Sequence, residues 1–246
     1  PKPQNPNTLN FEIDNDLRRR KLLLAKDKIL RIVDALQRMD EEFPFSSYND
    51  DGLKSKINFL NFIRNDVELI QDRIYVNLIT VPDEPGIRML KTEVSQALYS
   101  TIIGYNPSRF VGDLMPVESV NWKEANDFCK RLSWVMGLRV RLPKEHEYRS
   151  AIGPLRYVKL EKFVVSNAEE AKLTNLASKE PLGEGFYDLL GNVSEWLFSD
   201  GVFENEPVKH IGGHFNDRLN TIYSVPLRMV KRNERSRLIG FRFVVE

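Results

Sequence analysis

The chain has 246 residues, of which 41% are hydrophobic and 10% aromatic, so it can build a packed core and a disordered chain is not expected. The net charge is +1, so bulk electrostatics give no reason to expect a nucleic-acid partner. The one cysteine, Cys129, excludes an internal disulfide, and no apolar run approaches the about 18 residues that a membrane-spanning helix needs.

The first part of the chain is expected to form a tail and a pair of helices. Residues 1–9 begin PKPQNPNT, which is typical of a linker, and the start at Pro1 without a methionine indicates a fragment of a longer protein or a processed chain. Apolar residues then recur at helical spacing over 10–41 and over 51–73, which predicts a helical hairpin at 10–73. The hairpin either packs on the rest of the chain or offers a surface for self-association or for a partner.

A second domain is expected over 74–246, because proline and glycine there interrupt the chain every 10 to 20 residues. The β-branched run IYVNLITV at 74–81 favours a strand. The remaining segments predict short strands and ordered loops, so the expected fold class is α+β with much irregular structure. Three helices are expected, at 92–103 with Thr92 as its N-cap, at 122–136 and at 144–151.

The second domain contains, in chain order, the blocks NPSRF with PVESVNWKEA, RLPKEHEYRSA, GEGFYDLLGNVSEW, HIGGHF and IGFRFV. These blocks resemble the motifs of the formylglycine-generating enzymes, the sulfatase-modifying factor family. No single block is specific, but several in the same order are a strong signal. The resemblance covers about residues 75–246 and implies a C-type-lectin-like fold, in which Trp122, Trp196, Phe241 and Phe243 are core residues.

The catalytic cysteines of that family are missing from this sequence. Active members use a cysteine pair shortly after the Gly-Gly to oxidise a substrate cysteine with copper and oxygen. The resemblance places the two positions at Asp217 and Ile222, and neither side chain can bind a soft Cu(I) ion. Cys129 lies on the apolar face of the helix expected at 122–136, which is typical of a small core residue. We therefore expect no copper and no formylglycine reaction, and we expect the chain not to be an enzyme.

A related branch of the family uses non-haem iron held by histidines, which leaves an enzyme with rewired chemistry as an alternative. The chain has three histidines, and His146 falls in the helix expected at 144–151. His210 and His214 flank the Gly-Gly and could chelate a metal ion with Asp217 or Glu204. They could equally line a strand and a turn without any metal.

The stretch GEGFYDLLGNVSEW corresponds, by the same resemblance, to a calcium-binding loop of the active relatives. Carried over by position, the ligands are the side chains of Asp188 and Glu195 and the main-chain carbonyls of Gly191 and Val193. Calcium prefers hard oxygen ligands and tolerates irregular geometry, so such a loop could hold one ion. The alternative is a metal-free turn in which Glu195 pairs with an arginine such as Arg228 or Arg242.

The resemblance also implies a shallow groove beside the Gly-Gly segment, where relatives hold an extended peptide. The corresponding region is polar and basic, which indicates either a solvated loop or a surface that binds an acidic peptide, a protein or a sugar. The candidate contact residues are His214, Asn216, Asp217, Arg218, Tyr223, Arg228, Arg232 and Arg235.

These observations favour a non-catalytic module that binds a ligand or a protein, as the recognition part of a larger bacterial signalling or surface protein. Besides the His-bound metal enzyme, a calcium-dependent carbohydrate-binding domain is the other alternative, although the run ENEP at 204–207 matches the expected sugar-binding motif poorly. A protein or peptide partner is expected. The single cysteine slightly favours the cytoplasm, while a periplasmic or surface location stays open.

Overall fold

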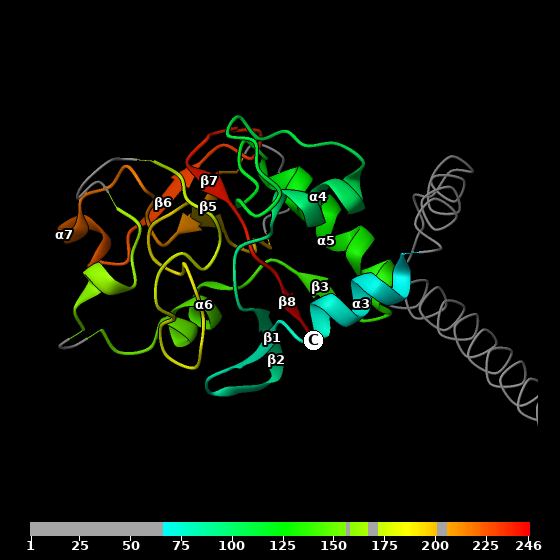
Figure 1. Cartoon of the computed structure of the whole chain (residues 1–246), viewed down its shortest axis with the longest axis horizontal. Coiled ribbons are helices and arrows are strands. Elements are labelled where there is room, and N and C mark those ends of the chain that lie inside the picture. Colours follow the sequence, from blue (N-terminus) through cyan, green and yellow to red (C-terminus); the bar gives the residue numbers. More distant parts are fainter. Residues whose placement is uncertain (1–65, 156–157, 167–171, 201–205) are drawn as a thin grey trace, which may run out of the picture.

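The computed structural model describes residues 66–155, 158–166, 172–200 and 206–246 (Figure 1). The linker-like tail, the first predicted helix and most of the second lie outside the described residues. Within the described residues, no helix is both long enough and apolar enough to cross a bilayer.

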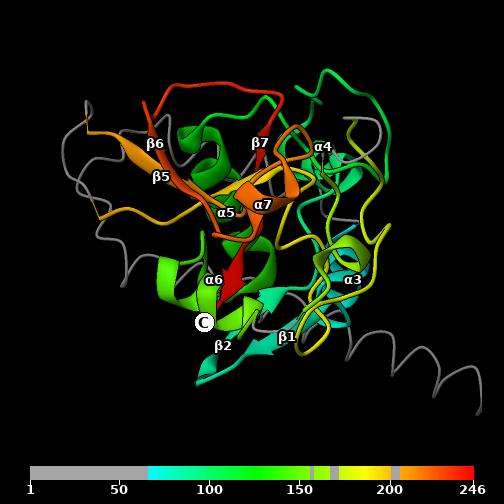
Figure 2. The same ribbon diagram turned by 90° about the vertical axis from the view of Figure 1, so that its left-hand side faces the viewer.

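Two four-stranded sheets form the frame of the domain. The labelled strands can be followed in Figures 1 and 2. The first has the order β1-β2-β8-β3, and the second has the order β6-β5-β4-β7, in which only β4 and β7 run parallel. The strands of the first sheet are β1 Leu78–Val81, β2 Glu84–Leu90, β3 Val140–Arg141 and β8 Val244–Val245. Those of the second are β4 Ser194–Trp196, β5 Val208–Ile211, β6 Leu227–Val230 and β7 Ile239–Gly240.

Short helices surround these sheets. The α-helices are α3 Val67–Tyr75, α4 Gln96–Ile103, α5 Trp122–Met136, α6 Glu145–Ile152 and α7 Leu219–Ile222, and a 3₁₀ turn, η1, spans Leu160–Lys162. In Figure 1, α3, α4 and α5 lie together on one side of the molecule and α7 lies at the opposite end. Long irregular segments connect the elements, as the α+β prediction requires.

The helix α5 has the predicted bounds because its ends carry clear signals. The side chain of Asn121 accepts a hydrogen bond from the Glu124 amide at 3.0 Å, and the Glu124 carboxylate accepts one from the Asn121 amide at 2.9 Å. This reciprocal capping box satisfies two amides at the start of the helix. Gly137 ends the helix at φ 64°, a left-handed conformation that favours glycine.

Two predicted boundaries are wrong. The helix expected from Thr92 begins at Gln96, with Ser95 as N-cap, because Val94 pairs through its backbone with Phe241 and Val117 instead of continuing a helix. The strand expected over 74–81 begins only at Leu78, because residues 74 and 75 form the last turn of α3.

The larger part of the core packs around α5. The ring of Phe128 lies parallel to Tyr99 with centroids 5.7 Å apart and edge-on to Phe241 at 5.2 Å. Trp196, Phe241 and Phe243 are fully buried, which confirms their predicted core role. Trp122 is only partly buried, and its indole N–H donates to the Leu197 carbonyl at 2.8 Å.

Candidate functional site

Two glycines position the loop that follows β5. Gly212 and Gly213 have φ values of 98° and 76°, a region that L side chains rarely adopt. A Cβ atom on Gly212 would lie 2.7 Å from the Leu189 carbonyl oxygen, and one on Gly213 would lie 3.2 Å from an oxygen of Asp217. The backbone therefore turns tightly and brings residues 214–217 against the end of the second sheet.

Asp217, where the resemblance places the first family cysteine, forms an ion pair. One oxygen of Asp217 accepts a hydrogen bond from Arg228 Nη2 at 2.8 Å. The other accepts one from the His214 amide at 3.1 Å and lies 3.5 Å from His214 Nδ1. The second position, Ile222, is fully buried in α7. One position is thus a fixed carboxylate and the other a core side chain.

A histidine lies beside this ion pair on the same face of the sheet. His210 on β5 is the cross-strand neighbour of Arg228 on β6, and its ring contacts Trp196 edge-on at 5.7 Å. Burial lowers the pKa of His210 to about 4, with the charge of Arg228 adding to the effect, and burial also lowers the pKa of His214. Both shifts favour the neutral form of the imidazole.

The described residues give the His-bound metal no support. They contain no group of three or more His, Cys, Asp or Glu side chains arranged to hold a metal ion. Asp217, which the sequence offers as the third ligand, is engaged by Arg228. The other suggested ligand, residue 204, lies outside the described residues, and His146 lies apart on α6, 3.3 Å from Glu84.

Two of the predicted contact arginines already interact with other residues of the domain. The guanidinium of Arg232 stacks over the Trp122 ring at 4.5 Å and donates to the Glu206 carbonyl at 3.3 Å. Arg235 pairs with Glu124 at 2.5 Å. Arg232 is only 9% exposed, whereas the side chain of Arg235 is 49% exposed.

Three other predicted contact residues are exposed. Asn216 and Arg218 lie on the loop between the Gly-Gly and α7, and Tyr223 follows α7 with 44% of its surface accessible. The Tyr223 hydroxyl lies within hydrogen-bonding distance of the carbonyls of residues 155 and 158, at 3.3 and 2.9 Å, so the exposed ring is held in place. Lys231, directly after β6, is also exposed. This group forms the open part of the surface.

A buried arginine from outside the predicted calcium loop is paired with one of its carboxylates. Arg242 donates to both oxygens of Glu195, from Nε at 2.6 Å and from Nη2 at 2.8 Å. Tyr148 donates its hydroxyl to the same carboxylate at 2.9 Å. The side chains of Arg242, Glu195 and Tyr148 are all fully buried. The pairing with Arg242, which the sequence offers as the metal-free alternative, is therefore present.

Two further carboxyl groups surround this pair. Glu93 accepts hydrogen bonds from the Asn192 side chain at 3.1 Å and from the Val193 amide at 3.2 Å. Burial raises its pKa well above the ordinary range, and the charges of Asp188 and Glu195 add to the rise. One oxygen of Asp188 accepts from the Ala177 amide at 2.7 Å, while the other is buried without a partner.

As arranged, the two predicted carboxylate ligands are not both available to a calcium ion. Both Glu195 oxygens are engaged, and a cation bound to them would lie beside the Arg242 guanidinium. The side-chain oxygen of Asn192 accepts from the Thr174 amide, so this residue does not add a ligand. Of the predicted acidic ligands, only one oxygen of Asp188 is left for a cation.

We expect the thermal unfolding midpoint of the full chain to be the same in EGTA and in millimolar calcium, because Arg242 already neutralises Glu195. Differential scanning calorimetry of the two samples checks this. A site filled at about a hundred times its Kd would add about 2.7 kcal/mol of stability, which such a scan resolves. A clear rise of the midpoint in calcium would contradict the arrangement and restore the predicted ion.

The lone thiol is not placed for chemistry. Cys129 is 2% exposed on the inner face of α5, and burial raises its pKa well above the ordinary range. A protonated, enclosed thiol is a poor nucleophile and a poor metal ligand.

Sequence reasoning missed Glu93 and Tyr148. Glu93 reaches the GNVSEW turn from a point 100 residues earlier in the chain, so no local spacing signals it. Tyr148 lies within the RLPKEHEYRSA block, but its part in the buried network appears only once α6 is packed against the turn.

The comparisons with known proteins concern the fold and the family. Three solved structures share the fold at 20–21% identity. "Treponema denticola variable protein 1" has a TM-score of 0.58 at 21% identity, over 65% of this chain and 84% of its own. "Crystal Structure of CarF" has a TM-score of 0.55 at 21% identity, over 68% of this chain and 92% of its own. "Structure of PvdO from Pseudomonas aeruginosa" has a TM-score of 0.56 at 20% identity, over 65% of this chain and 80% of its own.

A search of curated proteins found no match. A family model, described as "Sulfatase-modifying factor enzyme 1-like domain", matches residues 77–246, which include both sheets and the Gly-Gly loop. The chain therefore belongs to the sulfatase-modifying factor enzyme 1-like domain family.

Proposed function

We propose that this domain is a non-catalytic recognition module that binds a protein or peptide partner through the surface after the Gly-Gly pair. The observation that carries the proposal is the 2.8 Å ion pair between Asp217 and Arg228 at the position of a family cysteine. The ion pair and the buried Ile222 replace the two thiols that formylglycine chemistry requires. The family fold is retained although the cysteine pair is absent.

The open surface supplies groups suited to recognition. Asn216 and Arg218 offer hydrogen-bond donors, Tyr223 offers a fixed aromatic ring, and Lys231 offers a positive charge. The ion pair of Asp217 with Arg228 and the stacking of Arg232 on Trp122 hold the backbone that carries them. A preorganised surface loses less entropy on binding than a mobile one.

The test compares partner capture by the full chain and by matched variants. Reversing two exposed charges, Arg218→Glu with Lys231→Glu, should reduce recovery of the partner about tenfold, because repulsion at an interface opposes association. The control is Lys162→Glu with Lys179→Glu, which makes the same charge change at two exposed positions elsewhere. Quantitative mass spectrometry of the captured proteins gives the measurement. Equal loss in both pairs, or no loss in either, contradicts the proposal.

A second arm examines the chemistry directly. The full chain, incubated with a cysteine-containing peptide, copper and oxygen, should leave the peptide thiol unconverted. Conversion to an aldehyde, detected as a mass change, would overturn the non-catalytic part of the proposal. The binding part is tested separately by the charge-reversal variants.

A further inference from the structure

The strand β6 has an open edge. It is the terminal strand in the order β6-β5-β4-β7, and the described residues contain no strand beyond it. The Leu197 amide donates to the Lys209 carbonyl at 3.0 Å, so the polar backbone groups of Lys209 point toward β4. Successive residues of a strand point their backbone groups to opposite sides, so those of His210 point toward β6 and pair with Arg228.

The backbone groups that face outward therefore belong to Leu227 and Met229. Neither residue makes a backbone hydrogen bond outside the β5–β6 ladder with a described residue. Their side chains are also exposed, Leu227 by 36% and Met229 by 57%. Exposed strand edges with unpaired amides and carbonyls are sites where another extended chain can add.

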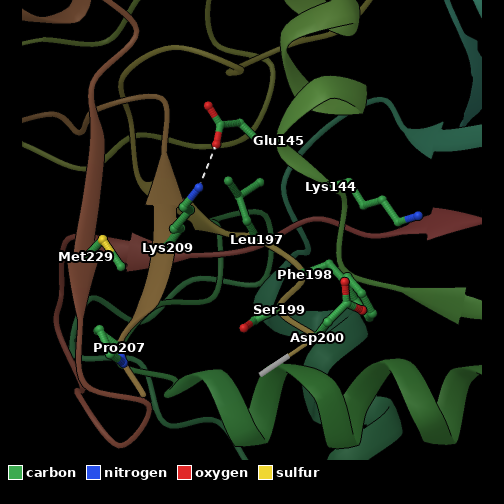
Figure 3. Close-up of a pocket in the computed structure, with 9 residues that line it drawn as sticks. All are labelled: Lys144, Glu145, Leu197, Phe198, Ser199, Asp200, Pro207, Lys209 and Met229. Atoms are coloured by element: carbon green, nitrogen blue, oxygen red, sulfur yellow. Dashed lines mark hydrogen bonds and ion pairs between the residues drawn. The ribbon is translucent and has the colours of Figure 1, made fainter. Parts of the chain in front are cut away.

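A cavity of about 270 Å³ adjoins this edge on the face that carries Met229 (Figure 3). Its apolar walls are Leu197, Phe198, Pro207 and Met229. In Figure 3, Met229 and Pro207 lie across the space from Phe198. The volume suits one large apolar side chain. The residues at the family's cysteine positions do not line it.

The charges around the cavity favour an acidic segment. Lys209 pairs with Glu145 at 3.0 Å across one end, so these two charges offset each other. Among the described residues, the exposed charges that line the cavity or directly follow β6 are then two ammonium groups, Lys144 and Lys231, against one carboxylate, Asp200. An approaching chain with acidic residues meets a net attraction.

We propose that β6 receives an acidic, extended peptide segment of the partner as a fifth strand of its sheet, with one apolar side chain seated in the cavity. The inference rests on the proposed function and gives its binding mode. Main-chain hydrogen bonds to Leu227 and Met229 supply affinity, and the cavity selects the side chain.

The test uses the full chain and a phage-displayed library of random 12-residue peptides. Selected peptides should combine apolar and acidic residues, and a synthetic copy should bind Met229→Pro about tenfold more weakly than the original chain, since proline removes an outward donor and the side chain that lines the cavity. Proline is tolerated on a strand edge where its missing amide faces solvent. The control Met229→Leu keeps the amide and an apolar side chain and should bind within about twofold.

Hydrogen exchange on the original chain keeps the test independent of variant folding. On peptide addition, the amides of Leu227 and Met229 should become protected, while the His210 amide, already within the sheet, should not change. Failure to select any peptide, equal binding by Met229→Pro, or unchanged exchange at Leu227 and Met229 would overturn the inference. If Met229→Pro still captures the natural partner while the Arg218 and Lys231 reversals lose it, the proposed function stands and strand addition fails.

Discussion

Replacing Arg242 with methionine is expected to lower the free energy of unfolding by about 3–5 kcal/mol, because it leaves the Glu195 carboxylate buried without its ionic partner. The loss includes the hydrogen bonds that Arg242 donates to the Tyr187 carbonyl at 2.8 Å and to two carbonyls near the end of β2. Urea unfolding followed by circular dichroism measures the change.

The matched control for Arg242 is an exposed ion pair. Arg149 bonds Glu145 at 3.0 Å on the surface of α6, and Arg149→Met should change stability by no more than about 0.5 kcal/mol. Adding Glu195→Gln to Arg242→Met should restore part of the loss, since it removes the uncompensated buried charge. A loss below about 1 kcal/mol for Arg242→Met would mean that Glu195 is protonated or solvated, contrary to the structure.

The substitution Gly191→Ala is expected to cost about 3 kcal/mol or more. Gly191 has φ 84°, and a Cβ atom there would lie 2.1 Å from the Val165 carbonyl oxygen and 2.8 Å from a methyl group of Val164. The left-handed backbone and the overpacking each carry a penalty of about 1–3 kcal/mol. The same urea titration gives the value.

Two other glycines separate the penalty of the left-handed backbone from the penalty of overpacking. Gly104 has φ 94° with nothing near the position of a Cβ atom, so Gly104→Ala should show the backbone penalty alone, about 1 kcal/mol. Gly86 has neither feature, and Gly86→Ala should be close to neutral. Equal losses in the free energy of unfolding for Gly191→Ala and Gly104→Ala would show that the turn around Gly191 shifts to accommodate the added methyl group.

The sequence predicts those parts of the fold whose signals are local. The bounds of α5 follow from the Asn121–Glu124 capping box and from Gly137, and the family follows from motif order. The start of α4 could not be predicted from Thr92, because backbone pairing of Val94 with distant residues overrides a local N-cap preference. Tertiary contacts of this kind outweigh propensities of a few tenths of a kcal/mol.

The candidate site divides in the same way. The sequence motif locates the loop that follows the Gly-Gly pair. The structure places this loop at the end of the second sheet, directly after β5. The sequence could not predict which of its arginines already interact within the domain. Arg232 stacks on Trp122 and Arg235 pairs with Glu124, and both partners are far away in sequence. A basic run indicates charge, but only the packed fold shows which charges are already engaged.

The strand β8 lies inside the first sheet, between β2 and β3, although it is formed by residues 244 and 245. In that order β2 and β3 do not bond directly to each other. The sheet therefore cannot form completely before residues 244 and 245 have been synthesised. A nascent chain ending at Arg242 would leave β2 and β3 as separate edges. Folding of this sheet is therefore expected to finish only after residues 244 and 245 have left the ribosomal exit tunnel, with those edges open to chaperones until then.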